Sequence, residues 1–440
     1  MKNIYRFNYN SIQELEKEIK ALDLAIPVST DLDVLAEQIV LSNGVVIPNR
    51  LAVHPMEGCD SREDGSPGQL TERRYLRYAE GGAGLIWLEA VAVNQRGRAN
   101  NQQLFLHRDN YHLFADLTDL IRERAKKKET DFRPYLVLQL THSGRFGQNK
   151  TILFNENTLD QAAGVRGDHP LITDRELEEL EGDYVEAARL AKAAGFDAID
   201  LKSCHGYFLS EMLAAHTRDG KYGGDYLNRT RFIKNVFRQI KAEVKIDLAI
   251  RLNIFDGIEF PYGWGTDRNG GIDWTEPKRL VQELAQLGVT IFNVTASTPY
   301  LKPHLSRPYD QPGVYGYPAP EHPLFGVNRL LNLARVIQGE IKDSIVVGTG
   351  YSWLREFSPY IAAGVLRAGW AKIIGFGREA FAYPDFADDI LFNRGLKAKR
   401  VCITCSKCTE LKAAQKNTGC VVRDPAIYLK FYQELLEERG

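Results

Sequence analysis

Eight short apolar segments rich in β-branched residues recur along the chain and alternate with segments of helical periodicity. The strand candidates are 51–56, 84–89, 135–140, 198–201, 247–252, 290–294, 345–347 and 372–374. Helical patterns lie between them, for example at 176–194, 231–244, 275–287 and 324–341. Continuous apolar strands that alternate with helices are typical of a parallel sheet buried on both faces. Eight such units predict an α/β fold, a (β/α)8 TIM barrel, with an open doubly wound sheet as the alternative.

Two further regions flank the predicted barrel, which spans residues 49–395. Residues 1–48 form a helical lead-in that ends in a hairpin, because Asn43-Gly44 stands between two apolar runs, and we expect this hairpin to close the barrel floor. Residues 396–440 form a cysteine-rich extension with a final amphipathic helix. Within the barrel, the long loop at 296–323 is rich in Pro, Tyr and His and is expected to shape the site through His304, Arg307 and His322.

Charge and hydropathy exclude several classes of partner. A net charge of −1 over 440 residues gives no reason to expect nucleic acid or an anionic membrane as a partner. The sequence has no run of about 18 apolar residues that would cross a membrane. Residues 11–20 read as a polar amphipathic helix and not as a secretory signal. We therefore expect a cytoplasmic protein, whose reducing surroundings favour metal binding over disulfides.

Four of the six cysteines lie close together in the extension. Cys402, Cys405, Cys408 and Cys420 follow the pattern C-x2-C-x2-C-x11-C. Four thiolates at such spacings can surround one metal centre, either tetrahedral zinc or a cubane iron–sulfur cluster. The spacing alone does not choose between them. The remaining two cysteines, Cys59 and Cys204, are expected to be isolated thiols.

Polar residues follow the carboxyl ends of the predicted strands, where a barrel of this kind places its reactive groups. Late glycine-rich turns let backbone N–H groups approach a phosphate, and Arg378 can add a forked contact. Arg251 lies on a buried strand, so a ligand or a carboxylate must accompany it. In chain order the strand ends read His54-Pro-Met-Glu, Glu89-Ala90, Gln139-Leu-Thr-His142, Asp200-Leu-Lys202-Ser-Cys-His205-Gly-Tyr207, Arg251-Leu-Asn253, Gly348-Thr-Gly350 and Gly375-Phe-Gly-Arg378.

A family resemblance rests on several motifs taken in order. They are Gln139-Leu-x-His-Ser-Gly-Arg, His205-Gly-Tyr-x-Leu, Tyr222-Gly-Gly, Asn228-Arg-x-Arg-Phe and the late Gly-Phe-Gly-Arg. Over residues 38–390 they resemble the old yellow enzyme family, which implies an FMN-dependent oxidoreductase on a (β/α)8 barrel. The tail resembles the branch with 2,4-dienoyl-CoA reductase and trimethylamine dehydrogenase, where a cysteine segment holds a [4Fe–4S] cluster. That branch usually has three residues between its second and third cysteine, whereas this chain has two. We expect no FAD/NADPH-binding module of the kind those relatives carry.

Carried over by position, the resemblance implies a flavin site and a substrate site. Flavin contacts are implied for Pro55, Met56, Glu57, Ala90, Gln139 and Arg251, and phosphate contacts for Gly350, Gly377 and Arg378. Tyr207 resembles the tyrosine that protonates the substrate, while Lys202 and His205 occupy the positions that hold the activating carbonyl. Because most members have histidine where this chain has Lys202, the substrate is not expected to be that of the simple enone reductases. His142 either faces the flavin or braces its loop.

Three functions remain open on this reading. The favoured one is reduction of an activated C=C bond in a small enone or enoyl-CoA type molecule, with electrons from NAD(P)H or an electron-transfer protein through the cluster. A dehydrogenase that oxidises amines and passes electrons out through the cluster is the alternative. A non-redox lyase would instead use Lys202 as a Schiff-base amine, with structural zinc in the tail. The sequence does not identify the substrate. It also does not fix the oligomeric state, and a homo-oligomer is compatible with it.

Overall fold

The computed structural model describes residues 5–127, 130–167, 169–313 and 316–439. Eight parallel strands form a closed barrel in the order β10-β3-β4-β5-β6-β7-β8-β9, so the last strand pairs with the first. This closure confirms the (β/α)8 barrel and excludes the open doubly wound sheet. The strands are β3 Leu51–Val53, β4 Leu85–Ala92, β5 Tyr135–Thr141, β6 Ala198–Ser203, β7 Asp247–Phe255, β8 Val289–Ala296, β9 Ile345–Gly348 and β10 Ile373–Phe376.

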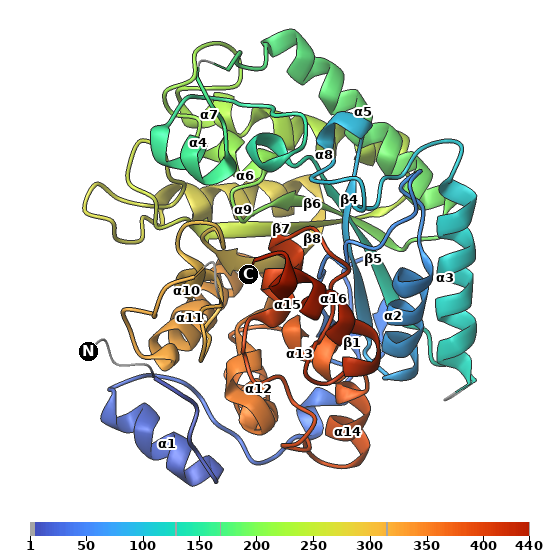
Figure 1. Ribbon diagram of the computed structural model, residues 1–440, viewed down its shortest axis with the longest axis vertical. Coiled ribbons are helices and arrows are strands. Elements are labelled where there is room, and N and C mark those ends of the chain that lie inside the picture. The colour runs from blue at the N-terminus through green and yellow to red at the C-terminus, as the bar shows by residue number, and fades with distance from the viewer. Residues whose placement is uncertain (1–4, 128–129, 168, 314–315, 440) are drawn as a thin grey trace.

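Helices surround the barrel on its outside (Figure 1). The longer ones are α2 Gln69–Glu80, α3 Tyr111–Lys126, α5 Asp174–Ala193, α8 Arg231–Glu243, α9 Thr275–Leu287, α11 Pro323–Glu340 and α12 Ser358–Arg367. The shorter ones are α4 Asn157–Ala163, α6 Phe208–Leu213, α7 Tyr226–Arg229, α10 Pro303–Ser306, α13 Arg378–Ala382 and α14 Phe386–Phe392, with 3-10 turns η2 Gln95–Gly97, η3 Gly144–Phe146 and η4 Tyr351–Phe357. None of the helices in the described ranges is both long and apolar enough to cross a membrane.

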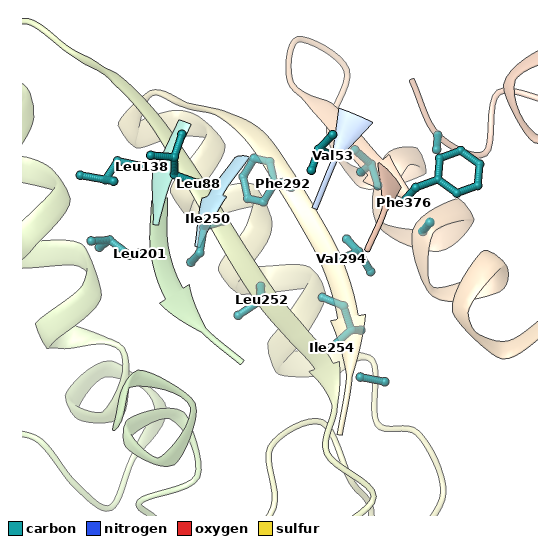
Figure 2. Close-up of a cluster of buried hydrophobic side chains, with 14 of the residues drawn as sticks. Val53, Leu88, Leu138, Leu201, Ile250, Leu252, Ile254, Phe292, Val294 and Phe376 are labelled. Atoms are coloured by element: carbon teal, nitrogen blue, oxygen red, sulfur yellow. The ribbon is translucent and has the colours of Figure 1, made fainter. Parts of the chain in front are cut away.

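Side chains along each strand alternate between the helix layer and the barrel interior, as the pleat requires. Figure 2 shows part of the outward set, which packs with the helices in the larger apolar cluster and includes Leu88, Leu138, Leu201 and Ile250. The inward set is apolar at the amino ends of the strands, where Trp87, Val137, Ala198, Ala249 and Ile291 form a second cluster. Two residues further along β5, β6, β7 and β8, the inward positions are polar, at Gln139, Asp200, Arg251 and Asn293. The apolar core therefore ends where a site begins.

The lead-in plugs the amino end of the barrel. It contains α1 Ile12–Ala21, the 3-10 turn η1 Asp33–Leu35, and an antiparallel hairpin of β1 Ile39–Val40 and β2 Val46–Ile47. Gly44 has a φ of +83° in the hairpin turn, a conformation that glycine adopts without strain. Ile39, Leu41 and Ile47 join the inward apolar cluster. The hairpin expected at Asn43-Gly44 therefore forms, and it packs against the barrel floor.

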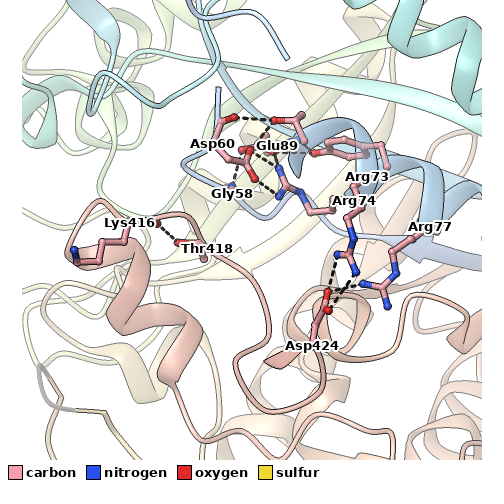
Figure 3. A network of polar contacts seen from close by, with 11 residues as sticks. Gly58, Asp60, Arg73, Arg74, Arg77, Glu89, Lys416, Thr418 and Asp424 are labelled. Atoms are coloured by element: carbon pink, nitrogen blue, oxygen red, sulfur yellow. Dashed lines mark hydrogen bonds and ion pairs between the residues drawn. The ribbon is translucent and has the colours of Figure 1, made fainter. Parts of the chain in front are cut away.

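The extension packs back onto the loop after β3 and onto α2 (Figure 3). Asp424 accepts hydrogen bonds from Arg73 and Arg77, each at 2.7 Å, and the backbone N–H of Thr418 donates to the Gly58 carbonyl at 2.7 Å. The helices of the extension are α15 Lys407–Ala413 and α16 Pro425–Glu437. A small apolar cluster of Leu411, Val421, Tyr428, Tyr432 and Leu435 joins them. These contacts hold the cysteine segment beside the carboxyl ends of the strands.

Candidate active site and cysteine cavity

Asp200 organises the polar residues inside the barrel. Its Oδ2 accepts from Gln139 Nε2 at 2.6 Å and from Trp87 Nε1 at 2.9 Å, and its Oδ1 accepts from the backbone N–H of Arg251 at 2.5 Å. Burial raises the pKa of this carboxyl to about 6. These bonds fix the orientation of the Gln139 carboxamide and hold it beside Arg251.

Arg251 is a buried cation without a carboxylate partner among the described residues. Its NH1 donates to the Pro55 carbonyl at 3.4 Å, and its Nε has no partner. Burial lowers the pKa of the guanidinium. Burying a guanidinium without acceptor atoms around it costs a desolvation free energy on the order of several kcal/mol. The position therefore suits a ligand that presents acceptor atoms to the barrel interior.

The other predicted cofactor residues lie along the same rim. Ala90 pairs with Gln139 across a register shift at Glu89, which turns Glu89 away toward α2. Met56 lies against Gly377, where an added Cβ would come within 3.1 Å of the Met56 sulfur. Gly350 is the other glycine implied to contact a phosphate through its backbone. It lies just before η4 and has a φ of +106°. These residues lie near the carboxyl ends of β3, β4, β9 and β10.

The close approach of β10 to His54 requires a glycine. A Cβ at Gly375 would lie 2.1 Å from the His54 ring, whose Nδ1 accepts a hydrogen bond from Asn293 Nδ2 at 3.0 Å. We expect Gly375→Ala to lower the unfolding free energy by about 1–3 kcal/mol, the usual effect of overpacking a rigid core. Gly182→Ala is the matched control, because Gly182 lies in α5 with nothing within 4 Å of an added Cβ. Urea denaturation of both variants measures the difference; equal midpoints would contradict the steric argument.

Tyr207 lies at the centre of a buried polar network above β6. Its hydroxyl hydrogen-bonds with the Tyr300 hydroxyl at 2.8 Å and accepts from Lys412 Nζ at 2.9 Å. The Nζ of Lys202 lies 3.8 Å from the centre of the Tyr207 ring and donates to Glu57 Oε1 at 2.9 Å. Burial raises the pKa of Tyr207 well above its usual value, so the hydroxyl carries its proton at neutral pH.

Glu57 joins the two lysines of this network. One carboxylate oxygen pairs with Lys202, and the other lies 3.2 Å from Lys412 Nζ. Burial alone would raise the pKa of Glu57, but the two ammonium groups outweigh it and lower the pKa to about 2. Glu57 is therefore a carboxylate. Burial lowers the pKa of Lys202, and the charge of Glu57 opposes this effect.

The two histidines near Tyr207 have different surroundings. His205 adopts a left-handed backbone with a φ of +63°, and its Nε2 lies 3.3 Å from Thr295 Oγ1. Burial, with Arg251 nearby, lowers its pKa well below the usual value, so it is neutral. His142 Nδ1 accepts from the backbone N–H of Gly144 at 3.1 Å, and its ring packs 4.9 Å from that of Phe208. These contacts support the bracing role for His142.

The loop at 296–323 contributes Tyr300, which the sequence did not single out. Its ring stacks on Phe146 with centroids 4.0 Å apart, and this stacking aims its hydroxyl at Tyr207. The three residues that were expected to shape the site make contacts that hold the loop. His304 bonds to Tyr317, Arg307 donates to Ser406 Oγ, and His322 accepts from the backbone N–H of Leu324 at the start of α11.

All four tail thiols line one cavity. Its wall consists of residues 402–408 and 420–423, which include Cys402, Cys405, Cys408 and Cys420, together with Arg378 and Phe381. Backbone N–H groups donate to two of the sulfurs, from Thr404 to Cys402 at 3.4 Å and from Arg423 to Cys420 at 3.3 Å. Within the described residues, no three His, Cys, Asp or Glu side chains are placed to hold a single metal ion. The structure thus brings the predicted ligands together around a shared space.

Arg378 lies at the border between the rim and the cysteine cavity. Its NH2 donates to the Pro308 carbonyl at 2.8 Å, while NH1 is buried and has no partner. Burial raises the pKa of the Cys402 and Cys408 thiols, and the charge of Arg378 opposes this effect at both. The guanidinium assigned to a phosphate by sequence therefore also faces the sulfurs.

The chain is similar to several flavin-linked enzymes. The model of the NADH:flavin oxidoreductase / NADH oxidase family matches residues 37–265. An NADH oxidase of Thermoanaerobacter brockii is 29% identical over 389 residues, 86% of this chain and 52% of that protein. An NADPH dehydrogenase of Bacillus subtilis is 30% identical over 217 residues, 48% of this chain and 61% of that protein.

Solved structures share the fold. A 2-naphthoyl-CoA reductase in complex with 2-naphthoyl-CoA aligns with a TM-score of 0.70 at 17% identity, covering 91% of this chain and 58% of that one. Histamine dehydrogenase from Rhizobium sp. 4-9 aligns with a TM-score of 0.69 at 21% identity, covering 92% and 53%. The chain thus spans between half and two thirds of the length of these relatives. Because the family model covers more than half of the sequence, the chain belongs to the NADH:flavin oxidoreductase / NADH oxidase family.

Proposed function

We propose that the protein reduces an activated C=C bond with bound FMN and that Tyr207 supplies the proton. The observation that carries this proposal is Tyr207, a residue 2% exposed, whose hydroxyl is held between Tyr300 and Lys412 on the rim that contains Arg251. A protonated phenol in a desolvated site is a suitable general acid. Bound FMN would supply the hydride.

The residues on the rim fit a flavin. Arg251 would meet the acceptor edge of the ring system, beside the carboxamide of Gln139, and Pro55, Met56 and Ala90 would line the ring. The buried and unpartnered Arg251 Nε and Arg378 NH1 are the atoms left for such a ligand. Gly350, Gly377 and Arg378 would hold its phosphate, through backbone N–H groups and a forked guanidinium contact.

Two donors are available to the carbonyl that activates the double bond. Lys202 contributes an ammonium group and His205 a neutral imidazole, and they stand three residues apart at the end of β6. Donors placed where charge develops stabilise the enolate oxygen that forms when the β-carbon is reduced. This arrangement supports an enone or enoyl thioester as the substrate class. The relatives named NADH oxidase and NADPH dehydrogenase support NAD(P)H as the electron source.

The network argues against the amine-oxidising alternative. The Lys412 ammonium group lies against the Tyr207 hydroxyl, and a protonated amine would be repelled there. The lyase alternative conflicts with membership of an oxidoreductase family. Reduction is therefore the better proposal.

The experiment starts from anaerobically purified protein. We expect about one FMN for each chain and flavin bleaching with NADH or NADPH. Reoxidation should then occur with cyclohex-2-enone, cinnamaldehyde or crotonyl-CoA, but not with histamine or trimethylamine. Flavin-free protein, or turnover with the amines alone, would overturn the proposal.

We further propose that the four tail cysteines hold a [4Fe–4S] cluster that passes single electrons to or from the flavin. Their arrangement around a shared cavity supports a common metal centre, and a cluster beside a flavin site has a redox partner with which to exchange electrons. N–H donors to sulfur, such as those from Thr404 and Arg423, are among the contacts that tune such clusters. An electron-transfer protein could then serve as the donor in place of NAD(P)H.

Replacing Cys405 with alanine should abolish iron binding, since the remaining three thiols cannot supply one ligand to each iron. The measurement is iron and acid-labile sulfide for each chain, with FMN content in parallel. Cys59→Ala is the control, because Cys59 is buried outside the cavity and should leave iron content unchanged. Zinc in the native protein, with no iron, would contradict the cluster.

A further inference from the structure

Lys412 belongs to the cysteine segment but reaches the active site. It lies on α15, four residues after Cys408, and its Nζ donates to the Tyr207 hydroxyl at 2.9 Å. The same Nζ lies 3.2 Å from Glu57, while the side chain as a whole keeps 30% of its surface exposed. The segment after the barrel thus contributes a cation to the group proposed as the acid.

Lys412 carries a positive charge at this position. Burial opposes the charge of Lys412, but Glu57 and Tyr207 outweigh it and raise its pKa well above the usual value. Lys202 already pairs with the other oxygen of Glu57. Glu57 is thus shared between two lysines, and the Lys412 ammonium group lies directly against the Tyr207 hydroxyl.

A proton donor in a dry site needs such a charge. When the O–H bond of Tyr207 breaks and a C–H bond forms on the substrate, a phenolate is left behind. An unpaired buried anion is costly, and an adjacent ammonium offsets that cost. Tyr300, 40% exposed and bonded to Tyr207, can return a proton from water to the phenolate.

We propose that Lys412 is a positioning residue for Tyr207, whose ammonium group orients the hydroxyl and stabilises the phenolate left by proton transfer. The proposal rests on the assignment of Tyr207 as the proton donor. It means that the cysteine segment completes the acid–base machinery of the barrel, in addition to any role in electron transfer.

The test is a double-mutant cycle in the holoenzyme, with the fastest of the three C=C probes named above. Lys412→Met should lower kcat by about 10–100-fold, the usual effect of losing a charge-assisted hydrogen bond, with little change in KM. Lys412→Arg should stay within a few-fold of the native enzyme. Lys416→Met is the matched control, because Lys416 lies on the same segment but pairs with Glu438.

The deciding readout is the combination with Tyr207→Phe. If Lys412 acts through Tyr207, adding Lys412→Met to Tyr207→Phe should cause no further loss. A full additional loss, or Lys412→Met with native kcat while Tyr207→Phe is slow, would overturn the inference and leave the proposed function standing. A native rate for Tyr207→Phe would overturn the proposed acid itself. Iron and FMN contents are measured on every variant. If Lys412→Met loses either group, Lys412→Arg is used in its place to decide the test.

Discussion

Replacing Tyr207 with phenylalanine should lower the rate of C=C reduction by about 10²–10⁴-fold, the contribution typical of a positioned general acid. Phenylalanine keeps the ring beneath the Lys202 ammonium, 3.8 Å from its centre, and removes only the hydroxyl. The rim that contains Arg251 and Gln139 does not depend on that hydroxyl, so FMN content should not change. Anaerobic stopped-flow separates the two half-reactions: flavin reduction should keep its rate, and reoxidation by substrate should slow.

Tyr300→Phe provides the control for this experiment. It removes the 2.8 Å hydrogen bond to Tyr207 but keeps the stacking on Phe146. We expect a loss of only a few-fold, because Tyr207 keeps its own proton and its bond from Lys412. If the two variants were equally slow in a single reoxidation step, for which Tyr207 already holds its proton, the assigned role of Tyr207 would be wrong.

Replacing Arg74 with methionine should lower the free energy of unfolding by about 3–5 kcal/mol, the usual effect of breaking a buried ion pair from one side. Arg74 donates to Asp60 at 2.6 Å and to Glu89 at 2.6 Å, and only 4% of its side chain is exposed. Without it, two carboxylates stay buried at the base of the loop that carries Glu57 (Figure 3). The midpoint of urea denaturation measures the effect.

The deficit of the Arg74 variant should depend on pH. Burial already raises the pKa of Glu89 to about 7, and losing the guanidinium raises it further. A carboxyl whose folded pKa exceeds its unfolded value destabilises the protein as pH rises, so the deficit should shrink as pH falls. Arg175→Met is the control, since Arg175 is 88% exposed in its pair with Glu179 and should change stability by less than about 1 kcal/mol. Equal midpoints for the two variants would refute the argument.

The barrel and much of the rim could be predicted from sequence because both rest on local patterns. Each apolar run had the length and flanking helices of a buried strand, and all eight formed. Every second residue of a strand faces the barrel interior. The change from apolar Val137 to polar Gln139, or from Ala249 to Arg251, therefore marks the boundary between core and site. The cysteine spacing likewise indicated one shared site, because cysteines that lie close together on a short segment are also close in space.

Lys412 and Tyr300 could not be found in this way. Lys412 sits in a short helix where a lysine is normally solvated, and nothing local marks a contact with Tyr207, 205 residues earlier. Tyr300 is one of several aromatic residues in its loop, and only the stacking on Phe146 selects it. Glu57 was expected beside the flavin, but its two lysine partners come from β6 and α15, which no local pattern connects. Contacts between residues far apart in the sequence are determined by tertiary packing, which local sequence patterns do not show.

The docking of the extension also bears on how the enzyme is assembled. Asp424 meets Arg73 and Arg77 across 351 and 347 residues of chain, so these contacts close some of the longest loops in the molecule. Closure of the barrel is similarly long-range, because β10 pairs with β3 between Ile374 and Leu51. Contacts so distant in sequence bear a large loop-closure entropy and form after local pairings. The contact between Lys412 and Tyr207 therefore depends on two long-range events, closure of the barrel and docking of the extension.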